Sequence, residues 1–135
     1  MIAGIGIDLV DVDRVDKLLT RFGDRAVKRL FTDRERAYAT SKANPARHFA
    51  ARFAAKEAAY KALAGSERAR AIGWREIEVL SNTDGSPRLE LHGLAAERAA
   101  VLGVERVHVT LTHSHATAAA VVVLERAPGD GVRGR

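Results

Sequence analysis

The 135-residue sequence has no cysteine, few aromatic residues (5%) and no long apolar run. Without cysteine, the chain can form no disulfide, thiolate nucleophile or cysteine-bound zinc site, which is compatible with a reducing compartment. The aromatic residues are too few for a basic-aromatic platform that stacks single-stranded nucleic acid. The longest apolar stretch, 116–124, is shorter than the ~20 residues of a membrane span, and the N-terminus lacks the basic region of an export signal. We therefore expect a cytoplasmic protein without a membrane segment.

The residues that are present indicate one globular domain. Hydrophobic residues make up 47% and charged residues 29% of the chain, which is long enough to bury a core. The formal net charge is +5, of which the last ten residues carry +2 through three arginines and one aspartate, so the body carries +3. This charge favours an anionic partner but is too small to indicate nucleic acid by itself. We predict a domain over residues 1–125 and a disordered tail over 126–135.

Apolar periodicity predicts the elements of the first half of the chain. Alternation over 5–9 predicts a strand whose other face, with Gly4, Gly6 and Asp8, is nearly bare and can admit a ligand. A helix with a buried stripe over 15–22 follows. Three more helices are expected, at 24–30 after a break at Gly23, from the capping box of Thr32 and Glu35 to the residues before Asn44-Pro45, and at about 46–63.

The second half is richer in strands. Alternation predicts a hairpin with strands around 77–79 and 89–91, joined by a turn at Asp84-Gly85. A helix over 94–102 is closed by Gly103, and strands over 107–111 and 118–124 should pair with each other. This order of elements predicts an α+β fold, with helices packed on one face of a largely antiparallel sheet.

Asp8 is the first candidate for chemistry. Its side chain shares a strand face with Gly4 and Gly6, which leave room for a bulky group such as a metal-bound phosphate beside the carboxylate. A strand-end aspartate can instead cap the helix that follows, and the spacing alone does not separate the two readings.

The segment 52–63, RFAAKEAAYKAL, places charge inside an apolar helical pattern. Lys56 falls within the stripe of large apolar residues and Glu57 at its edge, which core helices seldom tolerate. The alanines form a separate small-residue face on which another element can pack closely. Glu57 and Lys61 are four residues apart, so an ordinary solvated salt bridge is the alternative to a functional pair.

Polar side chains on one strand face form the third candidate. Alternation along the late strand places His108 and Thr110 on the same face, where an imidazole and a hydroxyl make a phosphate-binding surface. A structural histidine, hydrogen-bonded at a sheet edge, is the alternative for His108. His113 and His115 have the spacing of a zinc pair, but no third ligand is evident, which disfavours a zinc site.

A basic surface forms the fourth candidate. Residues 14–29 carry six basic and two acidic side chains, a local balance of +4. One helical face within this segment could dock an acidic protein helix. The docking residues that we predict are Arg14, Lys17, Leu18, Arg21, Phe22 and Arg25. A charge-rich solvated face is the alternative.

Together these segments resemble the holo-acyl-carrier-protein synthase group of the phosphopantetheinyl transferase family. The resemblance rests on GIGID at 4–8, RFAAKEA at 52–58 and HVTLTH at 108–113, and it extends over about 1–125. The strand aspartate and the Lys-Glu-Ala motif are far more specific together than either is alone. The resemblance therefore favours chemical roles over the structural alternatives.

The resemblance implies an α+β enzyme that transfers 4′-phosphopantetheine from coenzyme A to a serine of apo-acyl carrier protein and releases adenosine 3′,5′-bisphosphate. It implies Mg²⁺ held by Asp8 and Glu57, with Glu57 as the base, directly or through water, and Lys61 beside the leaving phosphate. His108 and Thr110 would contact nucleotide phosphates, and the basic surface would bind the acidic carrier protein. A homotrimer with active sites between protomers is the assembly that the family implies.

The chain departs from the family pattern at one place. Many members continue the helix with a Lys-Ala-x-Gly-x-Gly run, whereas residues 61–66 read KALAGS, so the loop near the nucleotide can differ in conformation.

Two other classes of function are alternatives. The basic pI of about 10.1 suits a nucleic-acid-binding module, although no helix-turn-helix or zinc spacing is present. A carrier-protein adaptor without chemistry would use the same basic surface, and Asp8 and Glu57 would then be dispensable.

Overall fold

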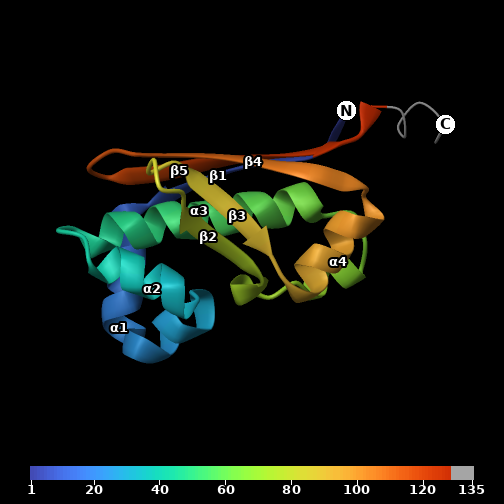
Figure 1. The fold of residues 1–135 in the computed structure, drawn as a ribbon. Coiled ribbons are helices and arrows are strands. Elements are labelled where there is room, and N and C mark those ends of the chain that lie inside the picture. Colours follow the sequence, from blue (N-terminus) through green and yellow to red (C-terminus); the bar gives the residue numbers. More distant parts are fainter. Residues whose placement is uncertain (129–135) are drawn as a thin grey trace.

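Two antiparallel sheets and four helices make up the part of the chain that the computed structural model describes, residues 1–128. The three-stranded sheet has the order β1-β5-β4, formed by β1 (Ile2–Asp11), β5 (Thr117–Arg126) and β4 (Val104–His113). The hairpin of β2 (Ile77–Ser81) and β3 (Pro87–Leu91) is a separate sheet. The helices are α1 (Val12–Leu30), α2 (Asp33–Thr40), α3 (Pro45–Leu63) and α4 (Gly93–Val101), with 3₁₀ turns at Arg68–Ala71 and Trp74–Glu76. The predicted α+β class is confirmed (Figure 1).

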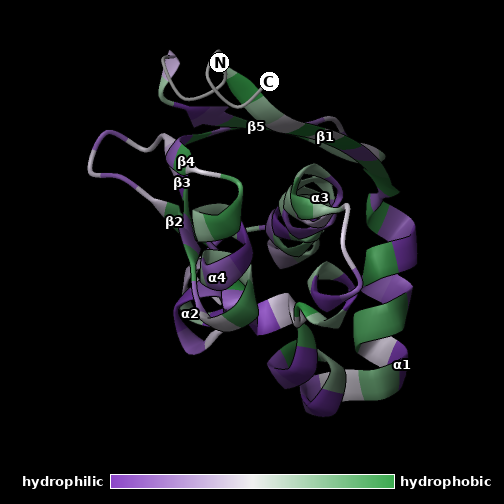
Figure 2. Cartoon of the chain, turned by 90° about the vertical axis from the view of Figure 1, so that its right-hand side faces the viewer, coloured by the Kyte–Doolittle hydropathy of each residue, from purple (hydrophilic) through white to green (hydrophobic). Residues whose placement is uncertain are grey.

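Helix α3 is the centre of the core. Figure 2 looks along this helix, which has the three-stranded sheet on one side and is flanked by α1 and by α4 with the β2–β3 hairpin. All alanines of α3 except Ala46 are buried, and those from Ala54 to Ala62 belong with Val122 and Leu124 of β5 to the main apolar cluster. Because alanine is small, the backbone of the sheet can lie close to the helix, as the small-residue face predicts.

Strand β1 differs from its prediction in the use of its two faces. A Cβ atom at Gly6 would overlap the carbonyl oxygen of Ala58, and one at Gly4 would overlap that of Ala62. The bare face is therefore filled by α3 and does not admit a ligand along its length. Three large apolar residues of β1, Ile5, Ile7 and Leu9, point away from the core instead and are 62%, 64% and 72% exposed.

The helices before α3 follow the sequence signals closely. Helix α1 has a kink at Gly23, whose φ of 61° is favourable only for glycine, and this is the predicted break. Helix α2 begins with the predicted capping box, in which Thr32 and Glu35 each bond the backbone N–H of the other. Glu35 is fully buried, so this cap also lies inside the core.

The second half confirms the predicted hairpin, helix and paired strands. Gly103, with a φ of 72°, follows α4, and β4 pairs with β5 over its whole length. The sequence did not indicate that β1 joins this pair through β5, so that the first strand lies beside the last. No helix of residues 1–128 is long and apolar enough to cross a membrane. Most of the predicted disordered tail, 129–135, lies outside the described residues.

Candidate functional site

Asp8 lies where β1 passes the flank of α3. One carboxylate oxygen is 2.9 Å from Lys61 Nζ, and the same ammonium donates a hydrogen bond of 3.0 Å to the carbonyl oxygen of Ile7. The N-cap of α1 is Asp11, so Asp8 is not the cap that one reading of the sequence suggested. Asp8 and Lys61 come from distant parts of the chain, and the fold brings them into contact.

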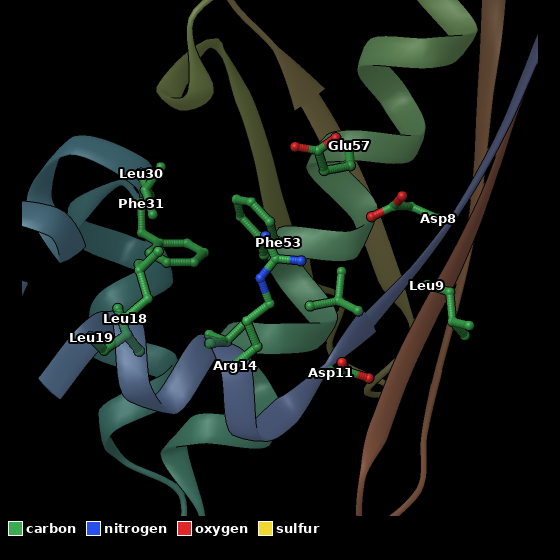
Figure 3. Close-up of a pocket in the computed structure, with 12 residues that line it drawn as sticks. Asp8, Leu9, Asp11, Arg14, Leu18, Leu19, Leu30, Phe31, Phe53 and Glu57 are labelled. Atoms are coloured by element: carbon green, nitrogen blue, oxygen red, sulfur yellow. The ribbon is translucent and has the colours of Figure 1, made fainter. Parts of the chain in front are cut away.

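Glu57 lies one helical turn before Lys61 on α3 and shares a cavity with Asp8. The two carboxylates lie near each other at one end of this cavity (Figure 3). Burial, and then the negative charge of Asp8, raise the pKa of Glu57, while Lys61 opposes the shift. No ion pair joins Glu57 and Lys61 within residues 1–128, so the solvated helix salt bridge is not formed. Two carboxylates with one ammonium between them carry a net negative charge.

The cavity has a volume of about 380 Å³ and runs from these carboxylates along α1. Its charged end holds Asp8 and Glu57, Arg14 reaches into the cavity from α1, and Asp11 lies apart from the two carboxylates at the start of α1 (Figure 3). Its remaining wall is mostly apolar and consists of Leu9, Val10, Val15, Leu18, Leu19, Leu30, Phe31 and Phe53. A polar end and an apolar wall are the usual make-up of a small-molecule site.

A second hollow adjoins Glu57 on the other flank of α3. It has a volume of about 360 Å³, and Tyr60, Arg70 and Trp74 line it together with Glu57. Arg70 is exposed and forms no ion pair within the described part of the chain, so it offers a free cation beside the site. No periodic or motif signal marks Arg70 in the sequence, because it lies in the short 3₁₀ turn Arg68–Ala71.

Lys56 borders the second hollow, but its charge is paired inside the core. It is completely buried, pairs with the buried Glu35 at 2.7 Å, and donates hydrogen bonds to the carbonyl oxygens of Trp74 and Ile77. Glu35 accepts in turn from the backbone N–H of Val79. The unusual charge within the apolar stripe is therefore satisfied inside the core, as buried charges require.

His108 and Thr110 lie on the other face of the sheet from Asp8. In the antiparallel register, His108 is opposite Val123 and Val123 opposite Ile5, so these residues share the outer face. His108 is hydrogen-bonded to Glu125 at 3.0 Å, which is the structural alternative for this histidine. Within one chain the structure does not bring His108 or Thr110 to the carboxylates.

The two later histidines do not form a zinc site within residues 1–128. The ring of His113 packs against that of His48, and Nδ1 of His115 is 2.8 Å from a guanidinium nitrogen of Arg47. A cationic neighbour is unsuitable for a metal ligand, which supports the sequence reading against zinc.

The predicted docking residues of α1 are on the surface. Lys17 pairs with Asp13, and Arg21 stacks on the exposed ring of Phe22. A shallow hollow of about 590 Å³ lies against this face. Its lining residues are Leu18, Arg21, Phe22, Arg25, Ala26, Arg29, Leu30 and Trp74, of which Leu18 and Leu30 also line the site cavity. The basic surface and the carboxylate site are therefore continuous.

The described residues contain one further acidic cluster that could be mistaken for a metal site. Ligand atoms of Glu78, Glu90 and His92 lie within 4.8 Å of one another. The guanidinium of Arg34 already bonds both carboxylates, at 2.7 and 3.1 Å. Burial would raise the pKa of Glu78, but hydrogen bonds from Arg34, Thr32 and His92 outweigh it and lower the pKa to about 2. An arginine thus holds the position that a cation would take.

The Asp8–Glu57 pair fits a divalent cation better. Its donors are carboxylate oxygens, it faces a cavity with room for a phosphate group, and the only cation paired with it in residues 1–128 is a half-exposed lysine. Mg²⁺ is commonly held by one or two carboxylates together with substrate phosphates and waters. The side chains present therefore match the donor set that this ion requires.

Comparison with known proteins identifies the family of the chain. The model of the 4′-phosphopantetheinyl transferase superfamily matches residues 4–121. The holo-[acyl-carrier-protein] synthase of Nitratidesulfovibrio vulgaris is 50% identical over 125 residues, and that of Solibacter usitatus is 44% identical, each alignment covering 93% of this chain and 99% of the relative.

Solved structures resemble the whole fold. The synthase of Neisseria meningitidis superposes with a TM-score of 0.82 at 29% identity, covering 93% of this chain and 100% of that one. The synthase of Bacillus anthracis in complex with CoA (3′,5′-ADP) gives a TM-score of 0.75 at 33% identity, covering 94% and 99%. The extent of these matches, together with the aspartate and the Lys-Glu-Ala helix at one cavity, establishes that the chain belongs to the 4′-phosphopantetheinyl transferase superfamily.

Proposed function

We propose that this protein transfers the 4′-phosphopantetheine group of coenzyme A to a serine of apo-acyl carrier protein. The observation that carries the proposal is the placement of Asp8 and Glu57 in one cavity, with Lys61 paired to Asp8. This cavity shares Leu18 and Leu30 with a hollow on the basic surface. A site for phosphates thus adjoins a surface for an acidic protein. The named relatives, holo-[acyl-carrier-protein] synthases, support the same activity.

The residues have distinct parts in the reaction. Asp8 and Glu57 would hold Mg²⁺, which would supply the positive charge needed to neutralise the negative charge of the transition state. Glu57, directly or through water, takes the proton of the serine hydroxyl. The serine oxygen then bonds to the phosphorus on the pantetheine side, the bond to the bridging oxygen breaks, and adenosine 3′,5′-bisphosphate leaves. Lys61 lies beside Asp8 and can stabilise the leaving phosphate.

The basic surface of α1 is proposed as the docking site for the carrier protein. Arg14, Arg21 and Arg25 form no ion pair within residues 1–128, so their charge is available to an acidic partner. The exposed Leu18 and Phe22 supply apolar contact beside them. Because Leu18 belongs to both hollows, a protein bound here would place a serine near the mouth of the site cavity.

We propose a homotrimer as the working assembly. The row of Ile5, Ile7 and Leu9 on the outer face of β1 is more exposed than a stable monomer favours, and contiguous apolar patches of this kind mark contacts between proteins. The number of three copies comes from the family resemblance. A second copy packed on this face would bury the patch and would lie close to His108 and Thr110. We propose that His108 and Thr110 contact the nucleotide bound by that neighbouring protomer.

The decisive experiment is direct. The protein is incubated with apo-acyl carrier protein, coenzyme A and Mg²⁺, and the mass of the carrier protein is measured. We expect an increase by one phosphopantetheine group, which chelation of the metal with EDTA should prevent. Glu57→Gln should lower kcat at least about 100-fold, since a general base contributes on this scale. Glu105→Gln, at an exposed position of β4, is the matched control and should keep the wild-type rate.

Other results would favour the rival functions. Stable binding of carrier protein without an added mass would indicate an adaptor. A salt-dependent shift of DNA with no change of the carrier protein would indicate a nucleic-acid-binding module. A Glu57→Gln enzyme with wild-type kcat would contradict the assignment of the base.

A further inference from the structure

Lys61 makes two contacts that bear on how the site binds its metal. Its ammonium is 2.9 Å from Oδ1 of Asp8 and 3.0 Å from the carbonyl oxygen of Ile7. The lysine side chain is 51% exposed, whereas that of Asp8 is only 16% exposed. The ammonium group of a half-exposed lysine is thus held against a largely buried carboxylate.

A bound Mg²⁺ would need the same carboxylate. The ion lies 2.0–2.1 Å from each oxygen ligand and demands near-octahedral geometry. If the ammonium of Lys61 stayed bonded to Asp8, it would lie close to the Mg²⁺ ion. The two positive charges would repel each other, and the waters bound to the metal would leave no room for the ammonium. Lys61 and the metal therefore compete for Asp8.

We propose that Lys61 is a displaceable counter-ion of Asp8, which occupies the carboxylate before the metal binds and is released to the phosphate of coenzyme A when it does. The inference rests on the proposed function. Three features of the side chain permit the change: it is half-exposed, it follows Glu57 by one turn of α3, and it is held at Asp8 by one carboxylate and one carbonyl contact. Release leaves an ammonium beside the position where a phosphate would bridge to the metal.

This arrangement couples the two substrates. A metal that binds alone must break the Lys61–Asp8 pair without compensation, so its affinity is reduced. Coenzyme A supplies a phosphate that can accept the released ammonium, so metal and coenzyme A should each bind more tightly in the presence of the other. Linkage requires that this coupling be the same in both directions.

The structure also allows a simpler role, in which Lys61 only braces strand β1. β1 is an edge strand, and the hydrogen bond to Ile7 satisfies a carbonyl that has no neighbouring strand on that side. In that case removal of the ammonium would lower thermal stability and leave the affinity for metal unchanged.

Metal binding to the full-length protein distinguishes these roles without any turnover. The free protein is titrated with Mn²⁺, and bound metal is followed by electron paramagnetic resonance and by calorimetry. We expect Lys61→Ala and Lys61→Met to bind Mn²⁺ about two- to five-fold more tightly than wild type, which is the range set by the strength of an exposed ion pair. Lys61→Met keeps the apolar stem of the lysine and so serves if the alanine variant is unstable.

Two controls separate direct competition from a general change of charge. Arg14→Ala removes one positive charge from the wall of the same cavity, where Arg14 makes no ion pair with Asp8, and should raise the affinity for Mn²⁺ less than Lys61→Ala. Lys17→Ala removes the exposed lysine paired with Asp13 and should leave the affinity for Mn²⁺ unchanged. An equal increase in Lys61→Ala and Arg14→Ala would overturn the proposal.

The coupling gives a second readout. Saturating coenzyme A should tighten Mn²⁺ binding in wild type, and by a smaller factor in Lys61→Ala, because that variant has no pair to break. If coenzyme A tightened Mn²⁺ binding by the same factor in wild type and in Lys61→Ala, the proposal would be contradicted. If wild type binds Mn²⁺ and Asp8→Asn abolishes the binding, but Lys61→Ala does not tighten it, only the counter-ion role fails. If wild type binds no Mn²⁺ even with coenzyme A, the metal site fails and the counter-ion role with it.

Discussion

At the scale of single residues, Gly6 sets the distance between β1 and α3. A Cβ at this position would overlap the carbonyl oxygen of Ala58, which is backbone inside a helix and cannot move aside cheaply. We expect Gly6→Ala to lower the free energy of unfolding by about 3 kcal/mol, at the upper end of overpacking effects. Urea denaturation at a fixed protein concentration would measure this change.

Gly73→Ala is the matched control for this substitution. The nearest atom to a Cβ at Gly73 would be Oε1 of Glu76 at 3.6 Å, an ordinary contact, and its φ of −87° suits alanine. Its effect should stay within about 0.5 kcal/mol. If the two variants were equally stable, the close approach at Gly6 would not be a constraint of the fold.

The same scale shows what sequence reasoning can reach. Asp8, Glu57 and Lys61 belong to short motifs whose spacing is visible in one dimension, and the fold brings these three together. The burial of Lys56 was not foreseen, because its partner Glu35 lies on another helix and reads locally as part of a capping box. A charge in an apolar stripe indicates a partner but does not identify it.

At the scale of elements, Glu78 joins α2 to the β2–β3 hairpin. Its buried carboxylate accepts hydrogen bonds from Thr32 and Arg34, at the start of α2, and its pKa is lowered to about 2 from an ordinary 4.5. A lowered pKa in the folded state means that the stabilisation is fully present above pH 4.5 and is lost as the pH falls towards 2. By this linkage the interaction is worth at most about 3 kcal/mol at neutral pH.

We therefore expect Glu78→Gln to destabilise the fold at pH 7 and much less at pH 3. The measurement is urea denaturation of both proteins at each pH. Glu90→Gln is the control, because Glu90 touches the same arginine but is more exposed, and its effect should be smaller at both pH values. A Glu78→Gln effect that does not change with pH would show that packing, and not the charge of Glu78, joins these elements.

Helix α1 carries the prediction about the partner. Arg14→Glu and Arg21→Glu should each raise KM for the carrier protein much more than KM for coenzyme A, because surface charges act on encounter and orientation. The difference from wild type should shrink with added salt, since the Debye length falls from ~10 Å at 0.1 M to ~3 Å at 1 M. Lys42→Glu, an exposed residue after α2, is the control and should have little effect. If both α1 variants kept the wild-type KM for the carrier protein at low salt, the docking site would not be on α1.

The elements also mark the limit of local patterns. The capping box of α2 and the break of α1 at Gly23 were predictable, because both depend on residues within one turn. Which face of β1 meets the core was not predictable, because alternation shows only that a strand has two different faces. The deciding contact is between Gly6 and α3, which is distant in sequence.

At the scale of the whole molecule, the homotrimer that we propose would explain both the exposed row on β1 and the position of His108. Ile5 and Ile7 lie on the outer face of the sheet with His108 and Thr110, while Asp8 faces inward. A monomer would leave the apolar row in water and the histidine away from the site. An assembly through this face accounts for both, and no single-chain pattern could reveal it.

Mixing two inactive variants tests this assembly. If each site combines Asp8 of one protomer with His108 of its neighbour, the homotrimers of Asp8→Asn and of the double variant His108→Ala, Thr110→Ala should both be strongly impaired. In trimers refolded together from equal amounts, a site is intact when its Asp8 and its neighbour's His108 are both native, which random mixing gives in about a quarter of sites. We expect transfer activity to recover to about that fraction of the wild-type rate.

Light scattering and a surface substitution complete the test. Ile7→Asp should reduce the mass measured by light scattering to that of one chain, because a charge would then have to be buried in the apolar contact. The mixed variants carrying Ile7→Asp as well should show no recovery. If each site is shared between protomers, transfer activity cannot recover without assembly. Full activity of the His108→Ala, Thr110→Ala protein by itself would mean that the outer face does not take part in catalysis. In that case the apolar row would serve assembly alone, and each site would be completed by residues of its own chain. Arg14 and Arg70 are candidates, because each lines a cavity together with Glu57 and forms no ion pair in the described structure.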